Sequence, residues 1–163
     1  MRAFLNVCCG LALALSVYAG NAEAAVLKAG AAAVDITPPA EMLPIAVNGG
    51  FNARYIDVIN DPLHAKAICL SDGNTTIVLS TVDSCVLDQE LIDASKKIAA
   101  KETGIPESQM LVSATHAHSC PSAVGAHGTD AVPEYREFLT KKLAEAIVQS
   151  HARLVPAELG TAV

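Results

Sequence analysis

Two histidines separated by one residue, His116 and His118, are the side chains in this sequence best suited to chemistry. Neutral imidazole is a preferred ligand of zinc and also acts as a general acid or base near neutral pH. If the backbone is extended here, residues two apart point to the same face, so both rings can approach one ion or one substrate group. The alternative is structural, with one ring bound to a backbone carbonyl and the other solvated. The motif alone leaves both interpretations open.

Two apolar segments are predicted to be the strands that position this pair. Residues 75–82 are rich in β-branched side chains and end at Asp83, and residues 110–115 end directly before the histidines. In parallel sheets ligands bind beyond the carboxyl ends of the strands, so the carboxylate and both imidazoles are expected at one edge. Asp83 is then either the acceptor that holds one imidazole in its tautomer or simply a strand-end turn residue.

The other elements are predicted from periodicity and turn residues. A strand is expected over residues 29–36, a long loop over 40–61, and the first strand of a hairpin over 63–70, with the turn at Asp72-Gly73-Asn74. A helix is expected over 88–103 before Gly104. A second helix opens at Pro133 and ends by Pro156, and residues 157–160 are expected to begin another strand. The stripe predicted to pack this second helix into the core is Tyr135, Leu139, Leu143 and Ile147.

This order of elements predicts an α/β fold. We expect a mixed sheet with parallel βαβ units and a β-hairpin, with the helices packed on the sheet. The chain has 163 residues, of which 52% are hydrophobic and 17% charged, which suits one folded domain and excludes a disordered segment. Its net charge is −6 and no run of Lys or Arg exceeds two residues, so neither a nucleic-acid partner nor an anionic-lipid surface is expected.

The first 24 residues have the features of an export signal. Arg2 supplies a positive charge, residues 3–19 form an apolar run, and Ala22-Glu23-Ala24 matches the small-x-small pattern that signal peptidases cleave after. The alternative, a membrane anchor, is disfavoured because the run is shorter than the roughly 20 residues needed to cross a bilayer. We therefore predict a signal peptide over residues 1–24, a mature chain from residue 25 to 163, and a secreted or periplasmic location.

Three cysteines remain in the predicted mature chain, namely Cys69, Cys85 and Cys120. Because this number is odd, they cannot all pair with one another in an oxidising compartment. Cys120 lies two residues after His118, but no motif around it favours a reactive thiolate, so we interpret it as an incidental or buried thiol rather than a nucleophile. His127, between Gly125 and Gly128, is interpreted as a solvated loop residue, with a place in the same cleft as the alternative.

Four stretches together resemble one known family. They are residues 29–38 (AGAAAVDITP), residues 61–67 (DPLHAKA), residues 76–83 (TIVLSTVD) and residues 111–121 (LVSATHAHSCP). In this order, and with the Ala-Thr-His-Ala-His-Ser core in the last stretch, the chain resembles the amino-terminal part of the catalytic domain of the neutral/alkaline, non-lysosomal ceramidase family of zinc amidohydrolases. The resemblance implies an incomplete, amino-terminal portion of a larger domain.

The resemblance also implies roles for the two histidines. His116 corresponds to a zinc ligand, so Zn²⁺ is the implied cofactor. His118 corresponds to the neighbouring catalytic histidine, which contacts the substrate or the developing oxyanion. The remaining ligands of the family, a second His, a Glu and a Tyr, and a catalytic Arg, are expected beyond Val163. The implied substrate is a ceramide-like lipid of sphingolipid metabolism, with transient contact to a membrane surface and no stable protein partner.

One departure from the family pattern lies beside the site. The family usually continues after the second His and Ser with a small residue and Pro, whereas this chain places the thiol of Cys120 there. Two alternatives to a ceramidase therefore stay open. One is a metallohydrolase of the same scaffold that acts on another amide or ester. The other is a non-catalytic binding module that lacks the full metal site.

Overall fold

A hairpin formed by β4 (His64–Ser71) and β5 (Thr76–Val82) is the centre of the fold, as the alternation of apolar residues predicts. The strands pair antiparallel from Ala65 opposite Val82 to Ser71 opposite Thr76. The Asp72 carboxylate fixes the turn by accepting the backbone N–H groups of Thr75 at 2.7 Å and Asn74 at 2.9 Å, and these bonds lower the pKa of that carboxyl. Local sequence therefore determines both the pairing and its register.

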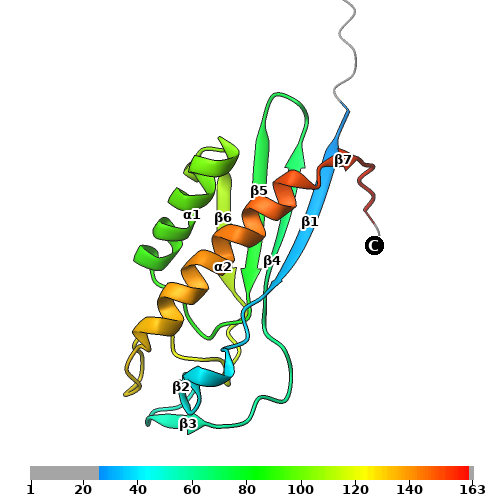
Figure 1. Ribbon diagram of the computed structural model, residues 1–163. Helices are drawn as coiled ribbons and strands as arrows, with labels where there is room; N and C mark the ends of the chain where they lie inside the picture. The colour runs from blue at the N-terminus through cyan, green and yellow to red at the C-terminus, as the bar shows by residue number, and fades with distance from the viewer. Residues whose placement is uncertain (1–25, 162–163) are drawn as a thin grey trace, which may run out of the picture.

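The computed structural model describes residues 26–161 (Figure 1), so the predicted signal peptide lies outside the described residues. A five-stranded sheet has the order β6-β5-β4-β1-β7, where β1 is Lys28–Asp35, β6 is Met110–Ala114 and β7 is Val155–Pro156. A separate two-stranded sheet pairs β2 (Ile45–Val47) with β3 (Arg54–Ile56). The helices are α1 (Gln89–Thr103) and α2 (Pro133–Ala152), with short 3₁₀ turns η1 (Ala40–Met42) and η2 (Glu107–Gln109). The mixed α/β fold is confirmed.

One parallel crossover unit places the edge strand of the sheet. The chain runs from β5 through α1 into β6, which lies parallel to β5, whereas β1 and β4 pair antiparallel. Helix α1 begins after Asp88, whose carboxylate accepts the backbone N–H of Leu91 at 2.9 Å, and ends at Gly104, which has a φ of 75°. Capping by Asp at the start and a left-handed glycine at the end is the pattern expected from the sequence.

The strand after α2 differs from the expectation. It lies at Val155–Pro156 rather than at residues 157–160, and it pairs antiparallel with β1 instead of extending a parallel run. The reason is a close approach at Gly30 of β1, where an added Cβ would sit 2.1 Å from the carbonyl oxygen of Ser150. The chain that leaves α2 therefore lies directly on β1 and pairs with it.

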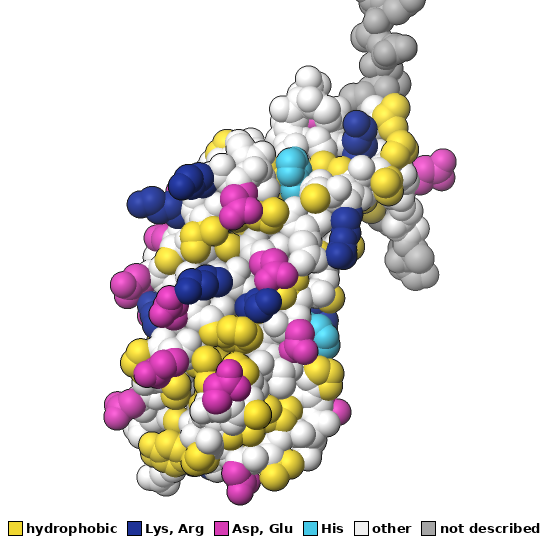
Figure 2. All heavy atoms as spheres, in the orientation of Figure 1, with side chains coloured by type: hydrophobic (Ala, Val, Ile, Leu, Met, Phe, Trp, Pro, Cys, Tyr) yellow, Lys and Arg dark blue, Asp and Glu magenta, His cyan; other side chains and the backbone are white. Residues whose placement is uncertain are grey.

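Both helices pack on one face of the sheet, and the core lies between them (Figure 1). The predicted stripe of α2 is buried, with Tyr135, Leu139, Leu143 and Ile147 all at most 1% exposed. The hydroxyl of Tyr135 donates a hydrogen bond of 2.9 Å to the carbonyl oxygen of Ile36, directly after β1. On the outer surface of the helices, acidic and basic side chains are interspersed (Figure 2). None of the helices within residues 26–161 is long and apolar enough to cross a membrane.

The opposite face of the sheet carries apolar side chains that no described residue covers. Ile68 is 49% exposed, Leu79 is 44% exposed and Leu111 is 61% exposed. Ile68 and Leu79 are direct cross-strand partners, so these side chains form a continuous apolar surface. A sheet with one polar and one buried face would place polar residues here; the apolar composition is that of a sheet covered on both faces.

The segment over residues 40–61, which was expected to be a long loop, contains η1 and the β2–β3 hairpin. Its strands are only three residues long, so they show no clear period. The hairpin is held by the distant loop after β6, because the backbone N–H of Asn48 donates to the carbonyl of Cys120 at 3.1 Å and that of Ser122 donates to Ala46 at 2.9 Å. Pairing with a remote segment leaves no local signal in the sequence.

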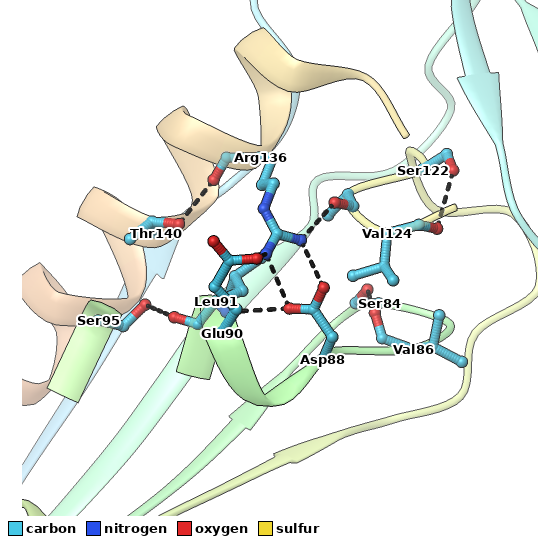
Figure 3. A network of polar contacts seen from close by, with 11 residues as sticks. Ser84, Val86, Asp88, Glu90, Leu91, Ser95, Ser122, Val124, Arg136 and Thr140 are labelled. Carbon is cyan, nitrogen blue, oxygen red and sulfur yellow. Dashed lines mark hydrogen bonds and ion pairs between the residues drawn. The ribbon is translucent and has the colours of Figure 1, made fainter. Parts of the chain in front are cut away.

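An arginine on α2 fixes the same loop from the other side (Figure 3). The guanidinium of Arg136 binds both carboxylate oxygens of Asp88 at 2.9 Å and donates to the carbonyl of Ala123 at 3.2 Å. This bidentate contact lowers the pKa of the Asp88 carboxyl, which also caps α1. One side chain therefore joins the first turns of both helices to the loop that carries the histidines.

Candidate metal and catalytic site

The carboxyl ends of β5 and β6 bring two loop segments together, as the parallel pairing of these strands predicts. The backbone N–H of Thr115 donates to the carbonyl of Val82 at 2.9 Å, and that of Ala117 donates to the carbonyl of Ser84 at 3.3 Å. Residues 83–86 and 115–118 therefore run side by side beyond the edge of the sheet. This contact sets His116 against Cys85.

The ring of His116 is oriented by the backbone of Cys85. Its Nδ1 lies 2.8 Å from the carbonyl oxygen of Cys85. A carbonyl can only accept a hydrogen bond, so Nδ1 carries the proton and donates, and Nε2 is unprotonated and keeps its lone pair. A protein that holds a histidine in this tautomer prepares Nε2 to bind a metal ion.

His118 completes the pair. Its Nε2 lies 3.1 Å from Nε2 of His116, with the ring centroids 4.6 Å apart and the rings inclined at 82°. The two rings meet as expected, but the expected cause is wrong. Strand β6 ends at Ala114, and His116 has a φ of 63°, so a left-handed residue and not an extended backbone turns the rings toward each other. Residues other than glycine rarely adopt this left-handed backbone conformation, and those that do concentrate at functional sites.

Two contacts from residues 49–54 hold His118 in place. The guanidinium of Arg54 donates to the carbonyl oxygen of His118 at 2.8 Å. Gly49 has a φ of 111° and packs so closely that an added Cβ would lie 2.4 Å from Cβ of His118. Only glycine combines this conformation with this approach. The β2–β3 region, which no sequence pattern connects with the histidines, is therefore part of the site.

The structure adds a third donor that the sequence analysis missed. One ligand atom from each of Cys85, His116 and His118 lies within 4.8 Å of the others, and Sγ of Cys85 is 4.0 Å from Nδ1 of His116. Nitrogen and sulfur donors suit a borderline-soft divalent cation such as zinc, and many zinc sites in proteins combine His and Cys ligands. The residues present thus fit a metal ion. The sequence did contain one indication of this donor, namely its position: Cys85 follows β5 as His116 follows β6.

The three donors line a cavity of about 110 Å³. Gly49, Gly50, Phe51, Val86 and His127 complete its wall. His127 is exposed in its loop, as expected, and also belongs to the wall of this cavity, as the alternative proposed, with its ring 5.4 Å from that of Phe51 and a φ of 51°. Since a water occupies about 30 Å³ in the liquid, the cavity has room for an ion with a few waters but not for a long acyl chain.

A second and larger hollow lies beside His118. Its volume is about 180 Å³, and the next residue after His118, Ser119, is part of its wall. The apolar residues of this wall are Pro38, Ile56, Val58, Ile59, Leu63 and Pro121, with Asn60 and Asp61 as further polar members. The site therefore combines the small cavity that the histidines line with an adjacent, larger hollow of mixed apolar and polar lining.

Asp83 does not hold either imidazole. Its carboxylate accepts the backbone N–H of His64 at 2.9 Å and lies 3.9 Å from Nζ of Lys66. Of the two roles considered for Asp83, histidine acceptor and strand-end residue, the structure supports the second, because the acceptor bound to His116 Nδ1 is the carbonyl of Cys85. Asp83 instead fixes the start of β4 against the end of β5.

Cys120 is a buried thiol, as interpreted from the sequence. It is 1% exposed, and burial raises the pKa of its thiol to about 11, so it stays protonated at neutral pH. Cys69 is fully buried in the core, where burial also raises the pKa of its thiol. Neither forms a disulfide, and Cys85 is likewise free within residues 26–161.

Two solved structures resemble this chain in fold. The crystal structure of neutral ceramidase from Pseudomonas aeruginosa aligns with a TM-score of 0.67 over 80% of this chain, at 17% sequence identity. A ceramidase complexed with C2 aligns with a TM-score of 0.65, also over 80% of this chain and at 17% identity. The chain spans 22% of the length of each of those chains. No family model and no curated protein matches the sequence. The resemblance to ceramidases is thus confirmed for the fold, which matches a fragment of those longer chains.

Proposed function

We propose that this chain is the amino-terminal part of the catalytic domain of a zinc-dependent amidohydrolase of the neutral ceramidase type. Its substrate is a ceramide-like lipid, and the bond hydrolysed is the N-acyl amide. The observation that carries the proposal is the pair of facing Nε2 atoms of His116 and His118, 3.1 Å apart, at the carboxyl edge of a ceramidase-like sheet. The protein is exported, with residues 1–24 removed as a signal peptide.

His116 is the residue that holds the metal in this proposal. The carbonyl of Cys85 fixes the proton on Nδ1, so the lone pair of Nε2 is available to a cation. Zinc, when bound, would supply a Lewis acid that polarises a carbonyl and lowers the pKa of water, so that hydroxide is available as a nucleophile near neutral pH. A catalytic zinc site has three protein ligands or more, so the remaining His, Glu and Tyr of the family would come from beyond Val163.

His118 acts on the substrate in this proposal. Its ring is held beside His116 by Gly49 and by the bond from Arg54 to its carbonyl. From there, Nε2 can donate a hydrogen bond to the oxygen of the scissile amide as negative charge develops on it, or move a proton to the leaving nitrogen. A positioned group of this kind contributes on the order of 10²-fold or more to the rate.

The adjacent hollow suits the apolar part of an N-acyl lipid. The side chains of Ile56, Val58 and Leu63 form one wall, and Ser119 joins this wall directly to the histidine pair. An alkyl chain bound there would leave its amide close to His118. The exposed apolar face of Ile68, Leu79 and Leu111 supports the view that a further layer of the complete domain covers this sheet. Transient contact with a membrane would deliver the substrate, and neither a nucleic acid nor a stable protein partner is involved.

The proposal is tested by assaying the complete polypeptide against a panel of N-acyl sphingoid bases, other N-acyl amides and simple esters. We expect release of fatty acid from the N-acyl sphingoid bases, its loss after removal of metal with a chelator, and its recovery on adding zinc. Turnover of other amides or esters alone would instead support a different metallohydrolase on the same scaffold. Absence of turnover and of bound metal would support a binding module and contradict the proposal.

A further inference from the structure

We propose that the thiol of Cys85 is a second ligand of the cation held at His116, so that this chain contributes one sulfur and one nitrogen donor to it. This inference rests on the proposed function, because it concerns the same site. The resemblance implies a metal shell of nitrogen and oxygen donors. The placement of Cys85 points to a sulfur donor in addition.

The first support is geometry. Cys85 lies beyond the end of β5, next to the segment that carries both histidines, and Sγ is 4.0 Å from Nδ1 of His116. A donor atom of each of Cys85, His116 and His118 lies within 4.8 Å of the others. Zinc–sulfur and zinc–nitrogen bonds are about 2.3 and 2.0–2.1 Å long, so Sγ of Cys85 and Nε2 of His116 can share one ion when the Cys85 side chain rotates toward Nε2.

The second support is the environment of the thiol. Cys85 is only 5% exposed, yet it lines the 110 Å³ cavity together with both histidines and His127. Cys69 and Cys120 are equally buried but lie outside this cavity, and Cys69 belongs to the hydrophobic core. Of the three cysteines in residues 26–161, Cys85 is therefore the one placed both out of bulk water and at an open space lined by imidazoles.

The third support is that one residue serves two roles without conflict. The carbonyl of Cys85 accepts the Nδ1 proton of His116, while its side chain faces the cavity. On metal binding the thiol releases its proton to solvent and the sulfur donates a lone pair to the cation. Replacing the side chain removes the sulfur but leaves the carbonyl contact in place, so the two roles can be separated by experiment.

The experiment uses the complete polypeptide loaded with zinc or with cobalt(II). We expect X-ray absorption at the zinc edge to show one sulfur neighbour at about 2.3 Å, and the cobalt(II) form to show a sulfur-to-cobalt charge-transfer band. Cys85→Ser is expected to lose both signals and to bind the metal at least about tenfold more weakly. Cys120→Ser and Cys69→Ser, which change equally buried thiols, are expected to retain the signals. Cys85→Ala provides a second variant if the serine hydroxyl prevents folding.

The outcomes separate this inference from the proposed function. Stoichiometric metal with only nitrogen and oxygen neighbours overturns the Cys85 ligand and leaves the proposed function standing. Retention of the sulfur signals in Cys85→Ser, or their loss in Cys120→Ser, assigns the sulfur elsewhere and also overturns it. If the unmodified polypeptide binds no metal, both proposals are contradicted.

Discussion

Replacing His116 with alanine in the complete polypeptide is expected to abolish zinc-dependent amidase activity. The substitution removes Nε2, the proposed ligand atom. Its lone pair is available because the proton is on Nδ1, which donates to the carbonyl of Cys85. Loss of a residue that only supports a ligand typically lowers metal affinity 10–100-fold, so loss of the ligand itself should lower it by at least about 100-fold. Bound zinc measured by elemental analysis and turnover of an N-acyl sphingoid base provide the two readouts.

His151→Ala is the matched control, because His151 lies in the last turn of α2 and outside the site. It should leave both metal content and turnover unchanged. Unchanged metal content and turnover in His116→Ala would refute the assignment of His116. A parallel His118→Ala variant separates two roles. Reduced turnover with full zinc content indicates contact with the substrate, as the resemblance implies, whereas reduced zinc content indicates a second ligand, as the 3.1 Å spacing alone would suggest.

Gly49→Ala is expected to inactivate the site while the fold persists. The added Cβ would lie 2.4 Å from both Cβ and the carbonyl oxygen of His118, and the φ of 111° is itself unfavourable for alanine. Either His118 or the backbone at Gly49 must therefore shift, which changes how His118 is held beside His116. Displacement of a reacting group by about 1 Å can lower a rate roughly 10²-fold. Two kinds of measurement are needed. Turnover reports the site, and circular dichroism and thermal unfolding report the fold, so together they distinguish a displaced histidine from a lost structure.

Two other glycines serve as controls for this variant. Gly73 has a φ of 89° in the β4–β5 turn, but no atom lies within 4 Å of its added Cβ. Gly73→Ala should therefore cost about 1 kcal/mol of stability through backbone strain alone and leave turnover unchanged. Gly50→Ala, in the same loop as Gly49, meets its nearest atom at 3.6 Å and should be tolerated. Full activity of Gly49→Ala would show that the contact with His118 is unimportant.

Elements with local signals could be predicted from the sequence. The hairpin turn depends on the Asp72 carboxylate and Gly73, and α1 depends on its cap at Asp88 and its end at Gly104. Each of these interactions joins residues within a few positions of one another, so the sequence specifies them directly. The buried stripe of α2 was likewise evident, because its periodicity reflects the face turned to the sheet.

Elements that depend on distant partners could not be predicted. Strand β2 is held by backbone contacts to residues 120–122, and β7 lies on β1 because Gly30 admits the end of α2. The link from Arg136 to Asp88 joins residues 48 positions apart. Short strands have little periodicity of their own, so such contacts determine them and leave no pattern in a single sequence.

The candidate site shows the same division. The His-x-His motif and the strands before it predicted where the imidazoles lie, but not how they meet. That depends on the left-handed backbone at His116 and on the approach of Gly49 from the β2–β3 region. The acceptor for His116 is the carbonyl of Cys85 and not the carboxylate of Asp83. Because every residue has a backbone carbonyl, the sequence does not indicate which one acts as the acceptor. Cys85 was missed as a donor because the sequence drew attention to Cys120, the thiol nearest in the chain but absent from the cavity.

The most direct test of the central claim is anomalous diffraction at the zinc absorption edge from crystals of the complete polypeptide. We predict an anomalous peak about 2.0–2.1 Å from Nε2 of His116, with Nδ1 still bound to the carbonyl of Cys85. A metal ion located elsewhere, with the ring of His116 turned away from it, would contradict the claim.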